Sequence, residues 1–519
     1  MKTKKIILLI SIIFILALTN CVNAIELNSN QTVYGNTLPD DSLDSLREII
    51  ETTNDNETIN IDNTELNASD NFIPITINKS LSIIGENTTI NGNGNGNLFI
   101  INNNVTIKNL KFTNTITYSI VNNGNLILEN CTFIDIWENA INNTGNLKII
   151  GSTFEDIKPI YRNDNIDSLA QYYLNKGVIY NTGTLTINSS KFDNITNPNQ
   201  ITFNNKTIVK KEGIIYNLNN TNIINTNFTN ITGRIMNNTG KLSIENSNFN
   251  DIYTNGIYIE INTSTKDYKI TYGKQSEALI VYNTNELILR NVTIKNVLYD
   301  TFWSRLPKVQ TKNGPIYNSG NCSIENSYFE NMGLNYEELL TEVNPIMRGG
   351  AIANYGILSI KNTTITKTEA EYGGAIYNEG NATLDNITSK LSSAMEKGYS
   401  IYNKNEIIIK NSIFEENNDN SRLLADCGVI HNSETGTCKL MNSTIKNNKV
   451  EFSGGWPEIY YGVVQNGGNM EIERCVFYNN TPDAKYSFVS GSYNIYNWGT
   501  LTATHNLFLE TGIGRPYYW

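Results

Sequence analysis

Few residues in this sequence have the types and spacing that acid–base chemistry requires. Hydrolysis of a sugar polymer with inversion needs two carboxyl groups about 6.5–9.5 Å apart. No Asn-Thr-Asp, Gly-His-Gly or Arg-Ile-Lys pattern is present to mark such a pair. We expect solvated charge where carboxyl groups cluster, and we predict no catalytic residue and no enzyme. The clusters are Asp40 and Asp41, the acidic stretch 337–342, and Glu369 with Glu371.

The histidines and cysteines also point to structural roles. His431 and His505 occupy positions of a repeat that elsewhere hold Tyr and Asn. No group of His, Cys and Asp has the spacing of a metal site, so we expect neither a metal nor a cofactor. Cys427 and Cys438 are close enough in sequence to form a disulfide, and buried, reduced thiols are the favoured alternative.

Aromatic residues are the better candidates for a binding role, because flat rings can stack on the faces of sugars. They gather in segments that interrupt the repeat, nearly always after its third strand, and such insertions commonly line one binding face. Ordinary packing of these segments over the rod is the alternative. The candidate ligand-binding residues are Tyr258, Tyr272, Trp303, Tyr336, Trp456, Tyr460 and Tyr461.

The repeat itself runs through most of the chain. Residues 178–192 read V-I-Y-N-T-G-T-L-T-I-N-S-S-K-F, and residues 315–329 read P-I-Y-N-S-G-N-C-S-I-E-N-S-Y-F. Hydrophobic residues stand two before, and four, six and eleven after, an anchor Asn, an alternation that indicates three short strands. The anchors are Asn122, Asn143, Asn181, Asn217, Asn238, Asn283, Asn318, Asn354, Asn378, Asn403, Asn432, Asn466 and Asn497.

This repeat predicts the fold. A single copy cannot bury its apolar side, whereas stacked copies make one continuous core and pair every strand. We expect the anchor amides to hydrogen-bond from coil to coil as a ladder. A second Asn, eight residues after the anchor, suits a left-handed turn. We therefore predict an all-β, right-handed parallel β-helix of about 13–14 coils, with a short N-terminal capping helix and a column of stacked Tyr residues before the anchors.

Four segments are expected along the chain. Residues 1–24 have three lysines, then an apolar run too short to span a membrane and a small-residue site ending at Ala24, as in a signal peptide. A lipoprotein signal around Cys21 is the alternative. Residues 25–72 form an N-terminal cap, residues 73–512 form the coils, and residues 513–519 are an aromatic tail that either plugs the last coil or leaves it as a contact surface.

Composition limits the partners. The net charge is −11, which disfavours nucleic acid, because its binding needs a clustered basic surface. Only 17% of residues are charged, which argues against a disordered polyelectrolyte. After residue 24 no apolar run reaches membrane-spanning length, so we expect a secreted or cell-surface protein without a transmembrane span.

Several motifs resemble a known family. G-G-A-I-A-N at 349–354, G-G-A-I-Y-N at 373–378 and I-K-N-L-K-F at 107–112 lie within Asn/Thr-rich coils that cover roughly residues 75–512. In these features the chain is similar to the adhesin-like proteins of methanogenic archaea. The resemblance implies an exported right-handed β-helix of the pectate-lyase-like class with a surface role in adhesion, and it brings no catalytic residues.

Three functions follow from these patterns. We expect an exported adhesin-like protein that binds glycans or cell-surface partners through aromatic loops on one face of a rod. A pectate-lyase-like carbohydrate lyase or hydrolase on the same scaffold is one alternative. A structural envelope component that associates end to end is the other.

Overall fold

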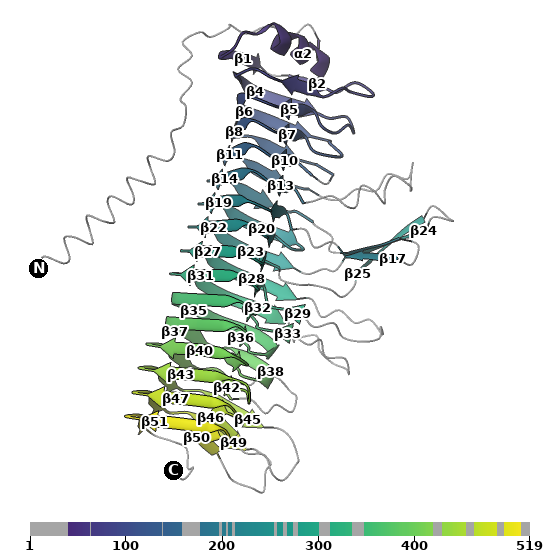
Figure 1. Cartoon of the computed structure of the whole chain (residues 1–519). Helices are drawn as coiled ribbons and strands as arrows, with labels where there is room; N and C mark the ends of the chain where they lie inside the picture. The colour runs from purple at the N-terminus through teal and green to yellow at the C-terminus, as the bar shows by residue number, and fades with distance from the viewer. Residues whose placement is uncertain are drawn as a thin grey trace, which may run out of the picture.

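The computed structural model describes residues 40–62, 64–137, 139–157, 177–196, 200–203, 206–209, 213–253, 257–262, 267–272, 279–299, 312–334, 347–418, 428–452, 461–484 and 492–509. Over these residues the chain winds as successive coils along a rod (Figure 1). The predicted all-β, parallel β-helix with one short N-terminal helix is confirmed.

One strand of each coil joins a 15-stranded parallel sheet. This sheet has more strands than the 13–14 coils predicted from the anchors. The reason is that its first two strands end in Ile77 and Ile101, which stand in register with the anchor Asn122. The strands are β3 (Ile75–Ile77), β5 (Phe99–Ile101), β7 (Ile120–Asn122), β10 (Ile141–Asn143), β13 (Ile179–Asn181), β18 (Ile215–Asn217), β21 (Met236–Asn238), β26 (Val281–Asn283), β30 (Ile316–Asn318), β34 (Ile352–Asn354), β36 (Ile376–Asn378), β39 (Ile401–Asn403), β42 (Ile430–Asn432), β46 (Tyr461–Asn466) and β50 (Ser492–Asn497).

The second and third strands of the coils belong to a 31-stranded sheet. These are β1 (Glu57–Asp62), β2 (Glu65–Asn67), β4 (Leu81–Asn91), β6 (Asn104–Thr113), β8 (Asn125–Glu129), β9 (Thr132–Ile134), β11 (Asn146–Ile150), β12 (Thr153–Glu155), β14 (Thr184–Asn188), β15 (Lys191–Asp193), β19 (Asn220–Ile224), β20 (Asn227–Thr232), β22 (Lys241–Glu245), β23 (Asn248–Tyr253), β27 (Glu286–Arg290), β28 (Thr293–Tyr299), β29 (Lys312–Asn313), β31 (Asn321–Glu325), β32 (Tyr328–Leu334), β33 (Met347–Arg348), β35 (Ile357–Tyr372), β37 (Asn381–Lys390), β38 (Ser393–Lys397), β40 (Glu406–Lys410), β41 (Ile413–Glu415), β43 (Thr437–Met441), β44 (Thr444–Lys446), β47 (Asn469–Glu473), β48 (Val476–Tyr478), β51 (Thr500–Thr504) and β52 (Leu507–Leu509).

Two smaller sheets are made by insertions. A four-stranded sheet contains β16 (Gln200–Phe203), β17 (Lys206–Val209), β24 (Ile257–Asn262) and β25 (Asp267–Tyr272), and β17, β24 and β25 project from the side of the rod (Figure 1). A two-stranded sheet pairs β45 (Lys449–Phe452) with β49 (Thr481–Ala484). Each sheet combines strands from the insertions of two coils, and all four insertions leave their coil after its third strand.

The core is a set of columns that run along the rod. Residues alternate between the interior and the surface, so equivalent side chains of successive coils stack on one another. Phe112, Phe133, Phe154 and Phe192 are fully buried, and the centroids of successive rings are 4.6–4.8 Å apart with nearly parallel planes. Since strands pair in register at about 4.8 Å, the spacing of the backbone sets the spacing of the rings.

The anchor asparagines form a continuous column of hydrogen bonds. In each pair, Nδ2 of one side chain donates to Oδ1 of the next at 2.7–3.0 Å, over the twelve steps from Asn122 to Asn497. Each amide from Asn122 to Asn466 is at most 1% exposed. The second N–H donates to a backbone carbonyl, as Asn318 does to Ile357 O at 3.0 Å, so this polar column is compatible with a buried position.

The second Asn column forms left-handed turns. Its asparagines have φ between 49° and 53°, a region that Asn tolerates better than most residues. His505 takes the same conformation with φ 56° in the last coil, as its place in the repeat predicts. The asparagines are Asn130, Asn246, Asn291, Asn326, Asn362, Asn411 and Asn442.

The two ends of the rod differ. Helix α2 (Leu43–Thr52) covers the first coil and buries Leu46 and Ile50, and the Ser42 hydroxyl caps it by accepting from Asp44 N at 3.1 Å. At the other end, Leu507, Phe508 and Leu509 of β52 are 42–49% exposed. Residues 513–519 lie outside the described part, and end-to-end association stays a prediction. No helix among the described residues is long and apolar enough to cross a membrane.

We expect Asn354→Leu to destabilise the rod. Leucine has a similar volume, but it removes two ladder bonds and leaves the Asn318 amide without its acceptor, at about 1–3 kcal/mol for a buried unsatisfied group. Asn321→Leu, on the exposed face of the same coils, is the matched control. Urea unfolding followed by circular dichroism compares them, and an equal shift of the two midpoints would contradict a stabilising role for the ladder.

Candidate functional site

The predicted aromatic residues fall mostly outside the described part of the chain. Tyr258 and Tyr272 belong to β24 and β25, which pair as an antiparallel hairpin, and Tyr461 begins β46. Their role in binding stays a prediction. Trp303, Tyr336, Trp456 and Tyr460 lie wholly outside the described residues.

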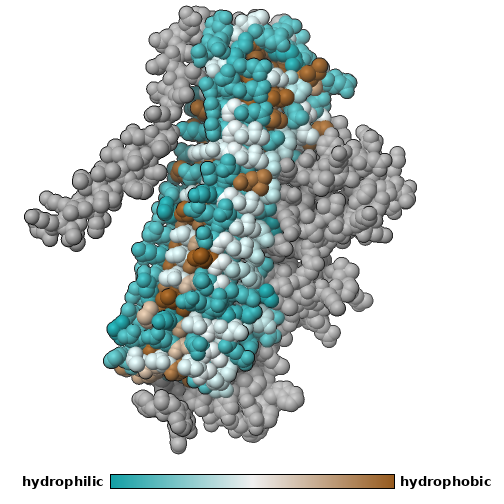
Figure 2. Space-filling model, in the orientation of Figure 1, coloured by the Kyte–Doolittle hydropathy of each residue, from teal (hydrophilic) through white to brown (hydrophobic). Residues whose placement is uncertain are grey.

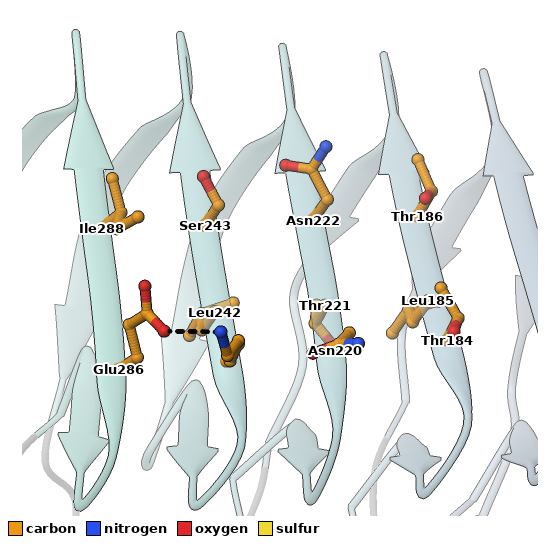
Figure 3. A pocket seen from close by; sticks show the side chains of 11 residues that line it. Thr184, Leu185, Thr186, Asn220, Thr221, Asn222, Leu242, Ser243, Glu286 and Ile288 are labelled. Atoms are coloured by element: carbon orange, nitrogen blue, oxygen red, sulfur yellow. Dashed lines mark ion pairs between the residues drawn. The ribbon is translucent and has the colours of Figure 1, made fainter. Parts of the chain in front are cut away.

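One open hollow lies on the outer face of the 31-stranded sheet, across β14, β19, β22 and β27 (Figure 3). Its volume is about 240 Å³. Short polar side chains cross it in a row, from Thr186 through Asn222 to Ser243, and Lys241 pairs with Glu286 at 3.2 Å. An exposed ion pair contributes little binding or stability. The hollow therefore offers hydrogen bonds but no pair of groups suited to proton transfer.

The visible face of the rod carries no large apolar patch. In Figure 2 hydrophilic and near-neutral atoms cover most of it, and the hydrophobic atoms are scattered. A ligand on this face would meet a mainly polar surface.

A denser group of polar and aromatic side chains lies where the third strand of a coil turns into the 15-stranded sheet. Gly349, Gly373 and Gly398 make this turn in successive coils, with φ of 73°, 65° and 72°. A Cβ on any of them would stand 2.0–2.2 Å from the carbonyl oxygen three residues later. Only glycine fits such a turn, which explains the Gly in G-G-A-I-A-N and G-G-A-I-Y-N.

We call this group the Arg348 corner: Arg348, Tyr355, Tyr372, Tyr377, Glu379, Tyr402 and Lys404. Arg348 Nη1 donates to Tyr355 Oη at 3.1 Å, and its guanidinium lies 5.2 Å from the centroid of the Tyr377 ring. Tyr377 Oη donates to Glu379 at 2.6 Å, and Lys404 pairs with the other oxygen of Glu379 at 3.1 Å. Burial raises the pKa of the Glu379 carboxyl, but these two donors outweigh it and hold that pKa below its usual value.

The corner is continuous with the predicted Tyr column. The ring centroids of Tyr355 and Tyr377 are 5.7 Å apart, and those of Tyr377 and Tyr402 are 5.6 Å apart. In β34 the column position is Ala353, and Tyr355 supplies the ring instead. The pattern of the repeat did not reveal Tyr355 or Arg348, since neither stands at a repeated position. Tyr180, Tyr216 and Tyr317 also contact a neighbouring ring of the column.

Glu371 is a buried carboxyl beside this corner, and not the solvated charge expected from the sequence. It belongs to β35 and is 8% exposed. The strand register shifts next to it, so Glu396 of β38 lies nearby, and such bulges are frequent at functional sites. One carboxylate oxygen of Glu371 has no hydrogen-bond partner among the described residues. Burial and the Glu396 charge raise the pKa of Glu371 to about 7, against the opposing effect of Arg348.

The neighbouring Tyr372 and His431 titrate far from neutrality. Burial and the charges of Glu371 and Glu396 raise the pKa of Tyr372 to about 12. Burial and the charge of Lys397 lower the pKa of His431 to about 3. His431 Nδ1 lies 2.6 Å from Gln465 Oε1, and its ring lies 5.3 Å from Tyr402 in the Tyr column. Its position is that of a stacked, neutral ring.

The described cysteines are buried, free thiols, so Cys438 is unpaired while Cys427 lies outside the described residues. Burial raises the pKa of the Cys438 thiol to about 12, which keeps it protonated and unreactive. Over the described part of the chain, no three His, Cys, Asp or Glu residues are placed to hold a metal ion. Besides Cys438, the buried free cysteines among the described residues are Cys131, Cys322 and Cys475.

Comparison with known proteins finds likeness in structure but not in sequence. No family model matches the chain, and no curated protein matches it. A PL6 alginate lyase in complex with a trisaccharide is 13% identical, with a TM-score of 0.40, over 86% of this chain and 85% of that one. A GH87 α-1,3-glucanase from Streptomyces thermodiastaticus is 9% identical, with a TM-score of 0.28, over 89% of this chain and 67% of the other. A surface adhesin of Streptococcus pneumoniae is 9% identical, with a TM-score of 0.24, over 86% and 87%.

These comparisons correct one expectation and leave another open. The prediction that the chain is not an enzyme is wrong: the solved structures that resemble it include polysaccharide lyases and a glucanase. At such low identity the likeness concerns the fold alone. The parallel β-helix part of the family resemblance is confirmed, whereas the archaeal adhesin family finds no match and stays a prediction.

We expect Glu371 to make stability depend on pH. Its pKa of about 7 lies above the usual 4.5, so the stability linked to its protonated form is complete below pH 4.5 and is lost as the pH rises through about 7. Glu371→Gln should remove this loss and unfold at a higher temperature than the unmodified protein at pH 8. Thermal unfolding from pH 4 to 8 tests this, with the exposed Glu86→Gln as control. Parallel curves for Glu371→Gln and the unmodified protein would contradict the buried, ionising carboxyl.

Proposed function

We propose that this chain is an exported β-helix protein that binds a polysaccharide along the Arg348 corner, in an adhesin-like role at the cell surface. The observation that carries the proposal is the alignment of cations, a carboxylate and tyrosine rings on consecutive coils of one edge. Arg348 pairs in register with Tyr372, and Tyr372 with Lys397.

The spacing of these groups supports a polymeric ligand. Coils repeat at about 4.8 Å along the rod, so equivalent side chains form a row parallel to its axis. An extended sugar chain also presents similar groups at regular intervals along its length. Arg348 and Lys404 offer charged donors, which make the stronger hydrogen bonds. The tyrosine rings pack on one another and on Arg348, so they hold the Arg348 donors in place.

The charged side chains remain open to a ligand. The side chains of Lys404 and Glu379 are 34% and 38% exposed although they are paired. Arg348 and Tyr402 are half-buried, so their orientation is fixed by neighbours before any ligand arrives. Such preorganised groups lose less conformational entropy on binding than free side chains do.

We expect Arg348→Met to weaken polysaccharide binding by about tenfold, the factor that corresponds to about 1.4 kcal/mol. Methionine keeps much of the apolar stem but removes the charge and the donors. Arg474→Met is the matched control, since Arg474 lies in the turn between the second and third strands of its coil. Binding of labelled neutral and acidic polysaccharides to each purified protein is measured by gel filtration. Binding that survives Arg348→Met unchanged, or no binding by the unmodified protein, would count against the proposal.

A second candidate function is cleavage of the bound polysaccharide, and Glu371 is the observation that favours it. A carboxyl with a pKa near 7 can both accept and donate a proton near neutral pH, as a general acid or base requires. One of its oxygens is buried without a hydrogen-bond partner, and a buried polar atom of this kind in a native structure calls for an explanation such as a catalytic role. Perturbed pKa values also arise in purely structural networks, so this function needs its own test.

If the chain cleaves its ligand, Glu371→Gln should lower the rate of product formation by about 10²–10⁴-fold, the usual contribution of a general acid or base. Binding should stay within a factor of two or three, because Gln keeps the size of the side chain. Shortened products are followed by gel filtration of the same labelled polysaccharides. The absence of products with the unmodified protein would eliminate this function while leaving the binding proposal intact.

A further inference from the structure

The left-handed turn between the second and third strand positions of the coil repeatedly carries an Asn-x-Thr sequence. In six coils the turn asparagine begins an Asn-x-Thr sequence, and all six asparagines are exposed with φ between 49° and 56°. In each of the six, the Thr two residues later lies in a strand and is partly exposed. The six asparagines are Asn87, Asn130, Asn291, Asn362, Asn386 and Asn442.

From this placement we infer that the turn asparagines followed by x-Thr, with Asn291 as the clearest, are acceptors for N-linked glycans. Asn-x-Ser/Thr marks such acceptors in exported proteins. The inference rests on export, which belongs to the proposed function, but it does not depend on ligand binding at the Arg348 corner.

The local geometry suits transfer of a glycan. Asn291 is exposed at the tip of the turn, and Thr293 is the first residue of β28. The amide nitrogen of Asn291 forms a bond to the anomeric carbon of a lipid-pyrophosphate-linked oligosaccharide. The bond from that carbon to phosphate oxygen breaks, the lipid pyrophosphate leaves, and one amide proton is released to solvent.

The modified side chain keeps its structural contact. Asn291 Nδ2 donates to Asn246 Oδ1 at 3.0 Å. A glycosylated amide retains one N–H, which is the donor that this contact needs. A glycan at the turn therefore extends from the surface without disturbing the coil.

The rod contains its own negative controls. Asn225, Asn246, Asn326 and Asn411 have the same left-handed turn, with φ of 49–53°, and are also exposed. The third residue of each sequence is Asn, Asn, Tyr or Ile instead of Ser or Thr. The effects of the turn geometry and of the Ser or Thr residue on glycosylation can thus be distinguished within one molecule.

The six Asn-x-Thr turns and the Arg348 corner lie at different edges of the coil. The turns lie between the second and third strands, whereas the Arg348 corner lies between the third strand and the 15-stranded sheet. Glycans at the six turns therefore leave the proposed binding edge open, while they cover backbone that proteases would otherwise reach.

The test compares glycopeptides of the protein purified from its native host. Mass spectrometry should find a glycan on Asn291 and none on Asn225. Thr293→Val should remove the glycan from Asn291 without changing the asparagine. Asn227→Thr should add a glycan at Asn225, whose neighbours in the turn column, Ser189 and Asn246, are not acceptors. Both substitutions lie at partly or fully exposed strand positions, and circular dichroism verifies that each variant is folded.

Two results would overturn the inference. One is an exported protein whose Asn291 peptide has the mass of the unmodified polypeptide. The other is an Asn227→Thr variant that is exported without a glycan at Asn225. Cell fractionation in the same experiment separates these outcomes from a failure of export, in which the protein stays inside the cell and the proposed surface role fails instead.

Discussion

Stacking of coils in register is the constraint on which the rest of this molecule depends, and the buried amide ladder enforces it. An Asn side chain inside the rod has two donors and one acceptor that must be satisfied. The same residue in the adjacent coils satisfies one donor and the acceptor, and a backbone carbonyl accepts from the other donor. A slip of one residue would leave amides along the whole column without partners and would move the aromatic and aliphatic columns to the surface. Polar and apolar columns therefore favour the same register.

The parts of the fold that repeat could be predicted from the sequence. The anchors, the left-handed turns and the Phe column recur with fixed spacing, so that their positions follow from one another. The first two coils were harder to recognise, because Ile77 and Ile101 stand in the anchor position. Solvent exposure was misjudged for Glu371, since a carboxyl in a polar segment gives no sign that a β-bulge will bury it.

The Arg348 corner could not be predicted for a related reason. Arg348 and Tyr355 come together only because a glycine turn folds the end of β33 against β34 and its neighbours, and the residues on the two sides of that turn follow no common period. The repeat thus fixes a scaffold in which side chains at irregular positions meet. Function in such rods is expected to reside where the repeat is broken. A shared fold alone therefore says little about activity.

The difference between the two ends gives the rod a direction. Helix α2 covers the first coil, whereas β50, β51 and β52 pair with a neighbour on one side only within the described residues. In a one-dimensional array, the free energy needed to open a coil depends on its contacts with adjacent coils. Among the described coils, opening is therefore expected to begin at the coil of β50, β51 and β52 and to move toward the helix, each step breaking one amide hydrogen bond of the ladder. Mechanical or thermal stress on the protein would therefore shorten the described rod from the side of β52 and leave the coils nearest α2 folded longest.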